Sequence, residues 1–438
     1  MTLWYAERAW LCAARGVAER VLVTTDGDRI TGVATGVAAP PEATRLPGLV
    51  IPGLVNAHSH AFHRALRGRT HSGSGDFWSW REQMYAIAER LDPDSYRELA
   101  RATYAEMVLA GITTVVEFHY LHHAPGGDRY ADRNAMGHAL RAAAADVGIR
   151  LVLLDTCYLQ SDVDGTPLSG PQLRYGDGDP DTWASRAADG PADGAAIHSV
   201  RGCPPEAMHQ VATWAAERGA PLHLHLSEQR RENDASLAVH GRTPTQLCAD
   251  TGVLGPATTA VHATHLSTAD IDLLGGSRTG VCFCPTTERD LADGVGPASA
   301  LVRAGATLSL GSDSHAVIDL FEEARAVELD ERLVTEQRGH HTATSLLAAA
   351  TAGGAHAAGV PVGEIAVGRL ADLVAVRLDS VRLAGGAAGD PVAAVVFAAT
   401  ASDVSHVVRG GELVVSGGAH RTVGDVAAAL RATIGCPH

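Results

Sequence analysis

The sequence contains no lysine, so all 35 of its basic residues are arginine. Schiff-base and pyridoxal-phosphate chemistry depends on a lysine amine, and a P-loop depends on a lysine that reaches the nucleotide phosphates. The sequence therefore excludes all of these functions. It also excludes a two-metal centre bridged by a carboxylated lysine, because no such side chain is available.

Long apolar runs and a positive charge balance are also missing. No stretch approaches the ~18 apolar residues of a membrane helix, and the segment Met1 to Trp10 lacks the charged head and apolar block of an export signal. The net charge of −15 argues against binding to nucleic acid or anionic membranes. Seven scattered cysteines indicate reduced thiols, and Cys282 and Cys284 are interpreted as strand filler rather than metal ligands. We therefore expect a cytoplasmic protein that binds neither nucleic acid nor membranes.

The chain has the composition of a globular protein, with 46% hydrophobic and 19% charged residues among 438. Its middle alternates between strand-like apolar runs and Ala- and Leu-rich stretches with helical spacing. Together with the run that precedes His58, these make eight strand–helix units, which fits a (β/α)8 TIM-type barrel better than an open sheet. The other strand-like runs lie at residues 113–118, 150–155, 195–198, 221–226, 258–263, 279–284 and 306–310.

Both ends of the chain resemble short strands that are separated by turn signals such as Asp26-Gly27-Asp28 and Gly410-Gly411. We interpret them as one small β-sandwich domain that is built from both termini. The prediction is therefore an α/β protein in which residues 1–50 with 362–438 form the small β domain. Residues 51–361 are predicted to form the catalytic barrel.

The stretch His58-Ser59-His60 is the first candidate site. It follows the apolar run from Leu46 to Val55, and if that run is a β-strand, side chains two residues apart project to the same face. Both imidazoles would then point at one place at the end of the strand, where they would make half of a tetrahedral metal site. The alternative is a pair of surface histidines beside a loop.

Three further strand ends carry residues of a similar kind. His225 lies at the end of the fifth strand, and Glu228 follows it. His262 lies at the end of the sixth strand, and Asp313 lies just past the eighth. Taken singly, these residues could be a core histidine, a loop carboxylate or a helix N-cap. Because barrel active sites lie at the C-terminal ends of the strands, agreement among four strand ends favours one metal centre.

This pattern resembles the amidohydrolase superfamily across nearly the whole chain. Members of its one-metal deaminase branch have His-x-His on the first strand, one histidine on each of the fifth and sixth, and an aspartate on the eighth. The absence of lysine fits this branch, because the two-metal members use a carboxylated lysine on the fourth strand. The resemblance implies a homodimer with one Zn²⁺ per subunit, and the ligand set also accepts Fe²⁺. The implied ligands are His58, His60, His225 and Asp313.

A site of this kind would perform hydrolytic deamination. Three neutral imidazoles and one carboxylate leave the metal a residual positive charge, which lowers the pKa of bound water to about 7. Asp313 could accept the proton of that water, Glu228 could carry a proton to the departing nitrogen, and His262 could orient the hydroxide. Ammonia would leave from a C=N–H or amidine carbon.

Within the superfamily, the sequence is most similar to the formimidoylglutamate deiminases, which convert N-formimino-L-glutamate to N-formyl-L-glutamate and ammonia in histidine degradation. The segments that carry this similarity are Phe77-Trp78-Ser79-Trp80-Arg81-Glu82, Glu117-Phe118-His119-Tyr120-Leu121-His122-His123, His198-Ser199-Val200-Arg201 and Gly311-Ser312-Asp313-Ser314-His315.

The similarity also implies a set of substrate contacts. Arginine forks bind carboxylates bidentately, which suits a substrate with two carboxylates. His63 stands where some members have glutamine, and it is a further candidate contact. The alternative for the two arginines is ordinary ion pairing with Glu82 or another neighbour. The implied contacts are Arg81, Tyr120, His198 and Arg201.

Two other functions stay open. A one-metal deaminase that acts on a purine or pterin would share the metal pattern, but such substrates favour aromatic surfaces and only 5% of the chain is aromatic. A barrel that binds metal without catalysis would be expected to lack Glu228 or His262, and both are present. The sequence does not separate formimino-glutamate from formimino-aspartate. Residues 68–75 and 124–132 are long enough to act as lids.

Overall fold

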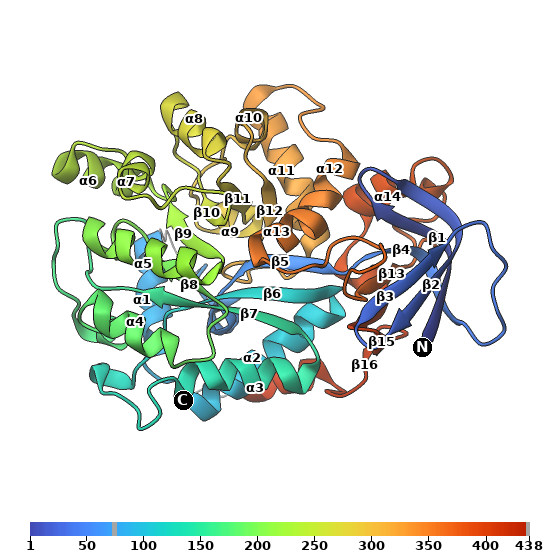
Figure 1. Ribbon diagram of the computed structural model, residues 1–438, viewed down its shortest axis with the longest axis horizontal. Coiled ribbons are helices and arrows are strands. Elements are labelled where there is room, and N and C mark those ends of the chain that lie inside the picture. The colour runs from blue at the N-terminus through green and yellow to red at the C-terminus, as the bar shows by residue number, and fades with distance from the viewer. Residues whose placement is uncertain (72–76, 435–438) are drawn as a thin grey trace.

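Eight parallel strands form a barrel in which each strand pairs with the next along the chain (Figure 1). The computed structural model describes residues 1–71 and 77–434. The barrel confirms the predicted architecture, since every predicted strand-like run overlaps one of its strands. The strands are β5 (Leu54–Ser59), β6 (Ile112–His119), β7 (Arg150–Cys157), β8 (Gly194–Ile197), β9 (Leu222–Leu226), β10 (Thr258–His262), β11 (Gly280–Phe283) and β12 (Leu308–Leu310).

The barrel closes where the segment after β12 meets β5. The amide of Asn56 donates to Ser312 Oγ at 2.7 Å and accepts from the Ser312 backbone N–H at 2.9 Å. Beyond it, Asp313 N donates to His58 O at 3.0 Å, and His60 N donates to Asp313 O at 3.3 Å. The first and last strands of the barrel are therefore joined at the end that carries the predicted site.

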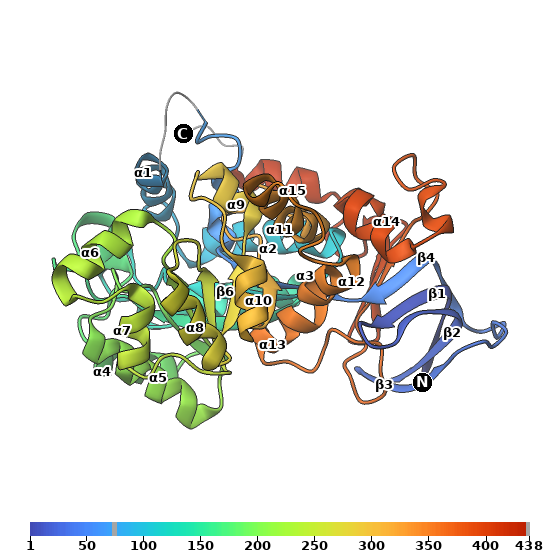
Figure 2. The same cartoon turned by 90° about the horizontal axis from the view of Figure 1, so that it is seen from above.

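Helices surround the barrel and cover its outer face (Figures 1 and 2). Several begin at a side-chain cap, as α2 does at Asp92, whose carboxylate accepts from Ser95 N. The α-helices are α1 (Phe77–Ala88), α2 (Pro93–Leu109), α3 (Ala135–Val147), α4 (Pro180–Ala188), α5 (Pro205–Arg218), α6 (Arg230–His240), α7 (Pro244–Asp250), α8 (Thr268–Gly276), α9 (Pro285–Asp290), α10 (Ala298–Ala304), α11 (Leu320–Thr335), α12 (Ala343–Ala348), α13 (Gly354–Ala358), α14 (Pro391–Ala398) and α15 (Val426–Ile434). Short helices are η1 (Ala61–Leu66), η2 (Pro125–Gly127), η3 (Gly170–Arg174), η4 (Ala349–Gly353), η5 (Gly386–Ala388) and η6 (Ala401–Asp403).

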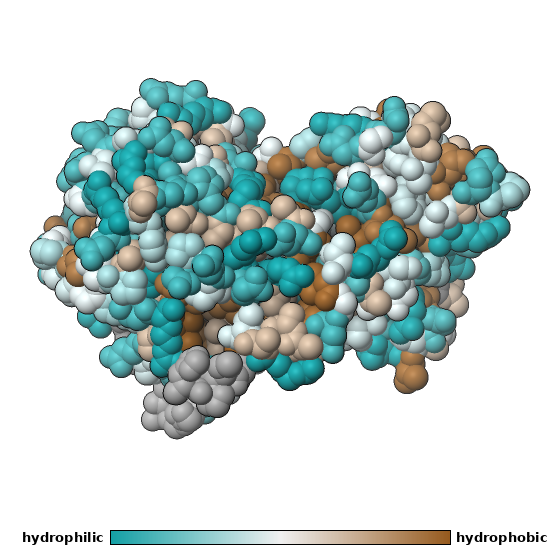
Figure 3. Space-filling view, turned by 90° about the horizontal axis from the view of Figure 1, so that it is seen from below, coloured by the Kyte–Doolittle hydropathy of each residue, from teal (hydrophilic) through white to brown (hydrophobic). Residues whose placement is uncertain are grey.

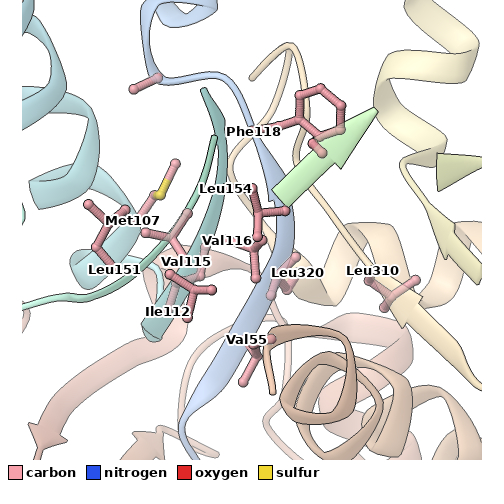
Figure 4. Packing of buried hydrophobic residues seen from close by; sticks show 14 of the residues in the cluster. Val55, Met107, Ile112, Val115, Val116, Phe118, Leu151, Leu154, Leu310 and Leu320 are labelled. Carbon is pink, nitrogen blue, oxygen red and sulfur yellow. The ribbon is translucent and has the colours of Figure 1, made fainter. Parts of the chain in front are cut away.

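The main hydrophobic core lies between the barrel strands and these helices. Val55, Val115 and Leu154 are fully buried and pack with residues of the flanking helices, such as Met107 and Leu320 (Figure 4). Because both faces of a parallel barrel strand are covered, every residue of β5, β6 and β9 is buried, including the polar ones. Burial of each such aliphatic side chain contributes roughly 1.5–3 kcal/mol to folding.

The apolar run from Leu46 to Val55 is divided between two sheets, which corrects its interpretation as one strand. β4 (Thr44–Pro52) belongs to the second sheet, and β5 begins at Leu54. The chain turns at Gly53, where a Cβ atom would lie 2.1 Å from Thr113 Oγ1. A larger residue would clash there, so the close approach at this turn requires glycine. The spacing of the two histidines is unaffected, because His58 lies in β5 and His60 directly follows it.

The second sheet contains strands from both ends of the chain and lies at the right of Figure 1. Its order is β16-β15-β14-β13-β4-β1-β2-β3, and it has its own buried cluster that includes Trp4, Ile30 and Val408. The sheet curls, because Ile30 N on β3 donates to Arg369 O at 2.9 Å in the segment before β13. The strands are β1 (Thr2–Cys12), β2 (Gly16–Asp26), β3 (Arg29–Ala34), β13 (Leu373–Val376), β14 (Val404–Arg409), β15 (Glu412–Ser416) and β16 (Ala419–His420).

We propose that the boundary between the two domains follows residues 1–50 with 362–438 and residues 51–361. Helix α15 nevertheless packs against the barrel helix α2, so the last part of the chain returns to the barrel. On the face shown in Figure 3, hydrophilic residues dominate and hydrophobic residues are scattered between them. Within the described residues, no helix is both long and apolar enough to cross a bilayer.

A buried ion pair joins the two domains. Asp372, in the segment before β13, accepts hydrogen bonds from Arg150 at the start of β7 and from Gly410 N at 2.8 Å. The Asp372 side chain is 1% exposed. We expect Asp372→Asn to lower the free energy of unfolding by about 2–3 kcal/mol, because it leaves the Arg150 charge without its counter-ion. Chemical denaturation measures this change.

The matched control is Asp26→Asn, because Asp26 is a 71% exposed partner of the N-terminal amine. That substitution should change the free energy by less than about 0.5 kcal/mol. Equal stability of the Asp372→Asn variant and the wild type would contradict the role given to this pair.

Candidate active site

A narrow cavity of about 50 Å³ opens at the C-terminal end of the barrel strands. His58 is fully buried beside it. The structure therefore brings the predicted site residues of several distant segments to one place. The predicted residues that line the cavity are His60, His63, Arg81, Tyr120, His198, Arg201, His225, Glu228, His262 and Asp313.

Four donor atoms form a compact cage at the base of this cavity. The Nε2 atom of His225 lies 3.2 Å from that of His58 and 3.3 Å from that of His60. Asp313 Oδ1 lies 3.3 Å from His58 Nε2 and 3.4 Å from His60 Nε2. Ligand atoms of a tetrahedral Zn²⁺ site lie about 3.3 Å apart, and these four separations are close to that spacing. The groups of donor atoms close enough to share one ion are His58 with His60 and Asp313, and His58 with His225 and His262. The donor set therefore fits a tetrahedral divalent cation.

The hydrogen bonds of the histidines leave the required nitrogens available. His60 Nδ1 lies 2.9 Å from Phe118 O, and His225 Nδ1 lies 2.8 Å from His198 O. A carbonyl oxygen can only accept, so each Nδ1 carries the proton and each Nε2 presents its lone pair to the cage. Burial lowers the pKa of His60 to about 3 and lowers that of His225 well below its usual value. Both imidazoles are therefore neutral, as metal ligands must be.

Asp313 is held in a backbone conformation that few residues adopt. Its φ angle is +39°, in the left-handed region, and its main chain is fixed to β5 by the hydrogen bonds that close the barrel. Burial raises the pKa of this carboxyl, but its hydrogen bond to His58 and the nearby histidines outweigh burial and lower it well below its usual range. Gly311 permits the approach, since a Cβ there would lie 2.7 Å from the Cβ of His58. Asp313 is thus an ionised carboxylate, the form that can bind a cation.

His262 and Glu228 lie next to the cage. His262 Nε2 is 3.7 Å from Glu228 Oε1 and 3.8 Å from Asp313 Oδ2. Burial lowers the pKa of His262, but Glu228 and the other surrounding carboxylates outweigh burial and raise it well above its usual value. Burial raises the pKa of Glu228. A carboxyl with a raised pKa can both give and take a proton near neutral pH.

Sequence reasoning missed two buried acids that support these residues. Glu288 Oε1 lies 3.3 Å from His262 Nδ1, and it also accepts from Cys284 N at 2.8 Å. Glu117 accepts from the Oγ of Ser59, which lies between His58 and His60 in the sequence, at 2.7 Å. Burial raises the pKa of Glu117 to about 7. Glu288 could have been found, because it follows the end of the seventh strand just as Glu228 follows the fifth.

The predicted substrate contacts lie on the other side of the cavity. His63 Nε2 and the Tyr120 hydroxyl are 2.9 Å apart. Arg201 lies 3.4 Å from Glu232 and 3.7 Å from Glu228, so the ion pairing named as the alternative for this arginine is present. Arg201 nevertheless lines the cavity. One side chain can therefore belong to an ion pair and still present donors to a ligand.

Aromatic side chains also gather at the cavity, although the chain as a whole has few of them. Besides Tyr120, the walls contain Trp80, Tyr85, Tyr158 and Tyr175. The composition of the whole chain predicts few aromatic surfaces for a flat aromatic substrate. The cavity walls correct that prediction, because they offer such surfaces. Two sequence predictions fall partly outside the described residues: the side chains of Phe77-Trp78, and residues 72–75 of the first predicted lid.

Arg174 holds three walls of the cavity together. Its fully buried guanidinium donates to His123 O at 2.8 Å, to Leu91 O at 2.6 Å and to Ala88 O. Its own carbonyl accepts from His122 N at 3.1 Å. A cation is favourable at the C-terminal end of a helix, which here is α1. The arginine thereby ties α1, the segment after β6 and the end of η3 to one another.

The fold and the site define an enzyme of the amidohydrolase family, and the chain belongs to that family. A model of the amidohydrolase family matches residues 49–414. The chain is therefore a hydrolase of carbon–nitrogen bonds, and the resemblance inferred from the sequence is confirmed.

The two neighbouring cysteines behave as expected of strand filler. Cys282 and Cys284 pack with Ala57 in a buried cluster.

The chain is also similar to individual members of this family. The chain is 34% identical over 437 residues to formimidoylglutamate deiminase of Pseudomonas aeruginosa, with 96% of each chain covered. It is 31% identical over 401 residues to 5-methylthioadenosine/S-adenosylhomocysteine deaminase of Halobacterium salinarum, covering 90% of this chain and 88% of the relative. A solved amidohydrolase structure from Brucella melitensis superimposes with a TM-score of 0.90 at 30% identity, covering 99% of each chain.

Proposed function

We propose that the chain hydrolyses N-formimino-L-glutamate to N-formyl-L-glutamate and ammonia. The observation that carries this proposal is that two arginines, Arg81 and Arg201, line the same cavity as His60, His225 and Asp313, whose donor atoms lie 3.2–3.4 Å from those of neighbouring cage residues, including the buried His58. A substrate with two carboxylates and an amidine needs cationic groups at one end and a hydrolytic centre at the other. The relative from Pseudomonas aeruginosa supports the same choice.

We also propose that the four cage residues hold one Zn²⁺ per subunit. The nitrogen and oxygen donors and their separations support zinc, and Fe²⁺ accepts the same ligands. A homodimer in the cytoplasm completes the proposal, and it is inferred from the resemblance to the family.

When bound, a divalent cation in this cage lowers the pKa of a water molecule to about 7. In the proposed mechanism, Asp313 takes a proton from the attacking water through Oδ2, since Oδ1 is the oxygen that faces His58 and His60. Glu228 gives a proton to the departing nitrogen, which leaves as ammonia while the formimino carbon becomes a formyl carbonyl. The raised pKa of His262 leaves a proton on both ring nitrogens, so Nδ1 donates to Glu288 at 3.3 Å and Nε2 donates to the oxygen of the attacking water.

The remaining residues bind and orient the substrate in this proposal. Arg81 and Arg201 bind the carboxylates, and Tyr120, His63 and His198 supply hydrogen bonds around the formimino group and the amino-acid backbone. Trp80 and the tyrosines exclude water from the cavity walls.

A second candidate function is deamination of an adenine-containing substrate. The aromatic walls of the cavity favour it, since they offer stacking surfaces for a purine. The relative from Halobacterium salinarum points the same way.

Ammonia release from a small panel of substrates tests the proposal. We expect kcat/KM for N-formimino-L-glutamate to exceed that for S-adenosylhomocysteine and guanine by at least about 100-fold, because a purine has no carboxylate to form charge-assisted hydrogen bonds with the two arginines. N-formimino-L-aspartate belongs in the same panel, because it is shorter by one methylene. Faster release from a purine substrate would select the second candidate. Release from no substrate by metal-loaded protein would indicate a barrel that has lost catalysis.

A further inference from the structure

Glu232 is a buried carboxyl beside the cavity to which the proposed mechanism gives no part. It lies in the first turn of α6, and its side chain is fully buried. Its Oε2 atom is 3.4 Å from Arg201 Nε, while its Oε1 atom has no hydrogen-bond partner within the described residues. Burial raises the pKa of Glu232 to about 7, against the opposing effect of Arg201. Burying a carboxyl in such a place costs free energy unless it pairs with a neighbouring cation.

Arg201 stands between two carboxyls. Its Nε faces Glu232, and its terminal NH2 group lies 3.7 Å from Glu228 Oε2. The guanidinium is planar and presents its N–H groups in a fixed fork, so an acceptor at Nε sets the direction of the remaining N–H groups. With Glu232 at Nε, Arg201 stays at the wall of the cavity.

Without an acceptor oxygen at position 232, the Nε of Arg201 would lose the contact that sets its direction. Glu228 would be the nearest carboxyl, and the arginine would move toward it and away from the cavity. A closer pair with Arg201 would also hold Glu228 in its ionised form, which opposes its role in giving a proton to the leaving nitrogen.

We propose that Glu232 is a positioning residue that holds Arg201 in place for a substrate carboxylate and keeps it from pairing closely with Glu228. This inference rests on the proposed function, since it requires a substrate with a carboxylate at Arg201. It assigns to α6, which carries no residue that lines the cavity, a part in substrate selection.

Two substitutions separate position from charge. Glu232→Gln keeps an oxygen at the same distance from Arg201 Nε but removes the charge, whereas Glu232→Asp keeps the charge but withdraws it by one methylene. We expect KM for N-formimino-L-glutamate to stay within about threefold of wild type in Glu232→Gln and to rise at least tenfold in Glu232→Asp. Steady-state kinetics of the zinc-loaded enzyme measure both, with metal content and unfolding temperature recorded for each variant.

A double-mutant cycle with Arg201→Met shows whether Glu232 acts through Arg201. In the Arg201→Met background, Glu232→Asp should raise KM no further, because the side chain that it positions is gone. Asp403→Asn is the matched control, since Asp403 is also buried and paired with an arginine, Arg382, but lies away from the cavity. That control should leave KM unchanged.

Three results would overturn the inference. The first is a folded, zinc-loaded Glu232→Asp enzyme with the KM of wild type. The second is the same rise in KM with and without Arg201, which would indicate a general structural role. The third is a wild-type enzyme that releases no ammonia from N-formimino-L-glutamate, which would overturn the proposed function and this role together. In the first two results, the wild type still turns over the formimino substrate, so the two failures are distinguishable.

Discussion

Replacement of Glu228 by glutamine is expected to lower kcat by about 10³–10⁴-fold while the bound metal is retained. Glutamine has nearly the same shape, so contacts with His262 and Arg201 at 3.7 Å can persist. It cannot take or give the proton that the departing nitrogen needs. The metal should stay bound in this variant, because Glu228 belongs to none of the groups of donor atoms that lie close enough to share an ion.

Ammonia release measures kcat for this variant, and elemental analysis by mass spectrometry measures its metal. Glu217→Gln is the matched control, because Glu217 is a 70% exposed glutamate on α5. It should have wild-type kcat. A Glu228→Gln enzyme with undiminished turnover would remove the proton-transfer role from this residue.

The second large effect is expected from His58→Ala, which should empty the metal site and reduce activity to the background rate. His58 is fully buried, and its Nε2 lies 3.2–3.3 Å from the donor atoms of His225 and Asp313. Without it, the remaining donors no longer enclose a tetrahedral ion, and buried water cannot replace an imidazole at comparable affinity. Metal content after dialysis, followed by the activity assay, measures both effects.

A neighbouring histidine supplies the control for that experiment. His223 lies two residues before His225 on β9, is equally buried, and has its Nε2 2.9 Å from Ala357 O. Glutamine can replace this hydrogen bond, so His223→Gln should keep its metal. Retention of a full metal complement by His58→Ala would contradict the proposed cage.

The barrel and the residues at its strand ends could be predicted because they follow from regular geometry. Alternation along a strand places His58 and His60 together, and parallel strands in a barrel end at the same mouth. The run from Leu46 to Val55 shows the limit of that reasoning, since β4 pairs with β1 and β13 whereas β5 pairs with β6, and these partners are distant in the sequence. Apolar character alone does not reveal which of two sheets a residue joins.

The substrate side of the cavity was less predictable for a different reason. Tyr158 could have been found, because it directly follows β7. Tyr175 lies after η3 and is positioned through Arg174, whose buried hydrogen bonds to backbone carbonyls have no sequence signature. Overall composition also misled, because the aromatic residues are concentrated at the cavity instead of being spread evenly. Long-range contacts rather than local propensity decide such walls.

The hydrogen bonds that join β5 to the segment after β12 place two of the four proposed ligands, His58 and His60, on one edge of the closing seam and Asp313 on the other. A cation bound there would link the first strand of the barrel to the segment that follows the last one. Its binding free energy would then also resist the opening of the seam, and loading with metal would protect the amides of both edges from hydrogen exchange. Catalysis and closure of the barrel would in this way draw on a single ion.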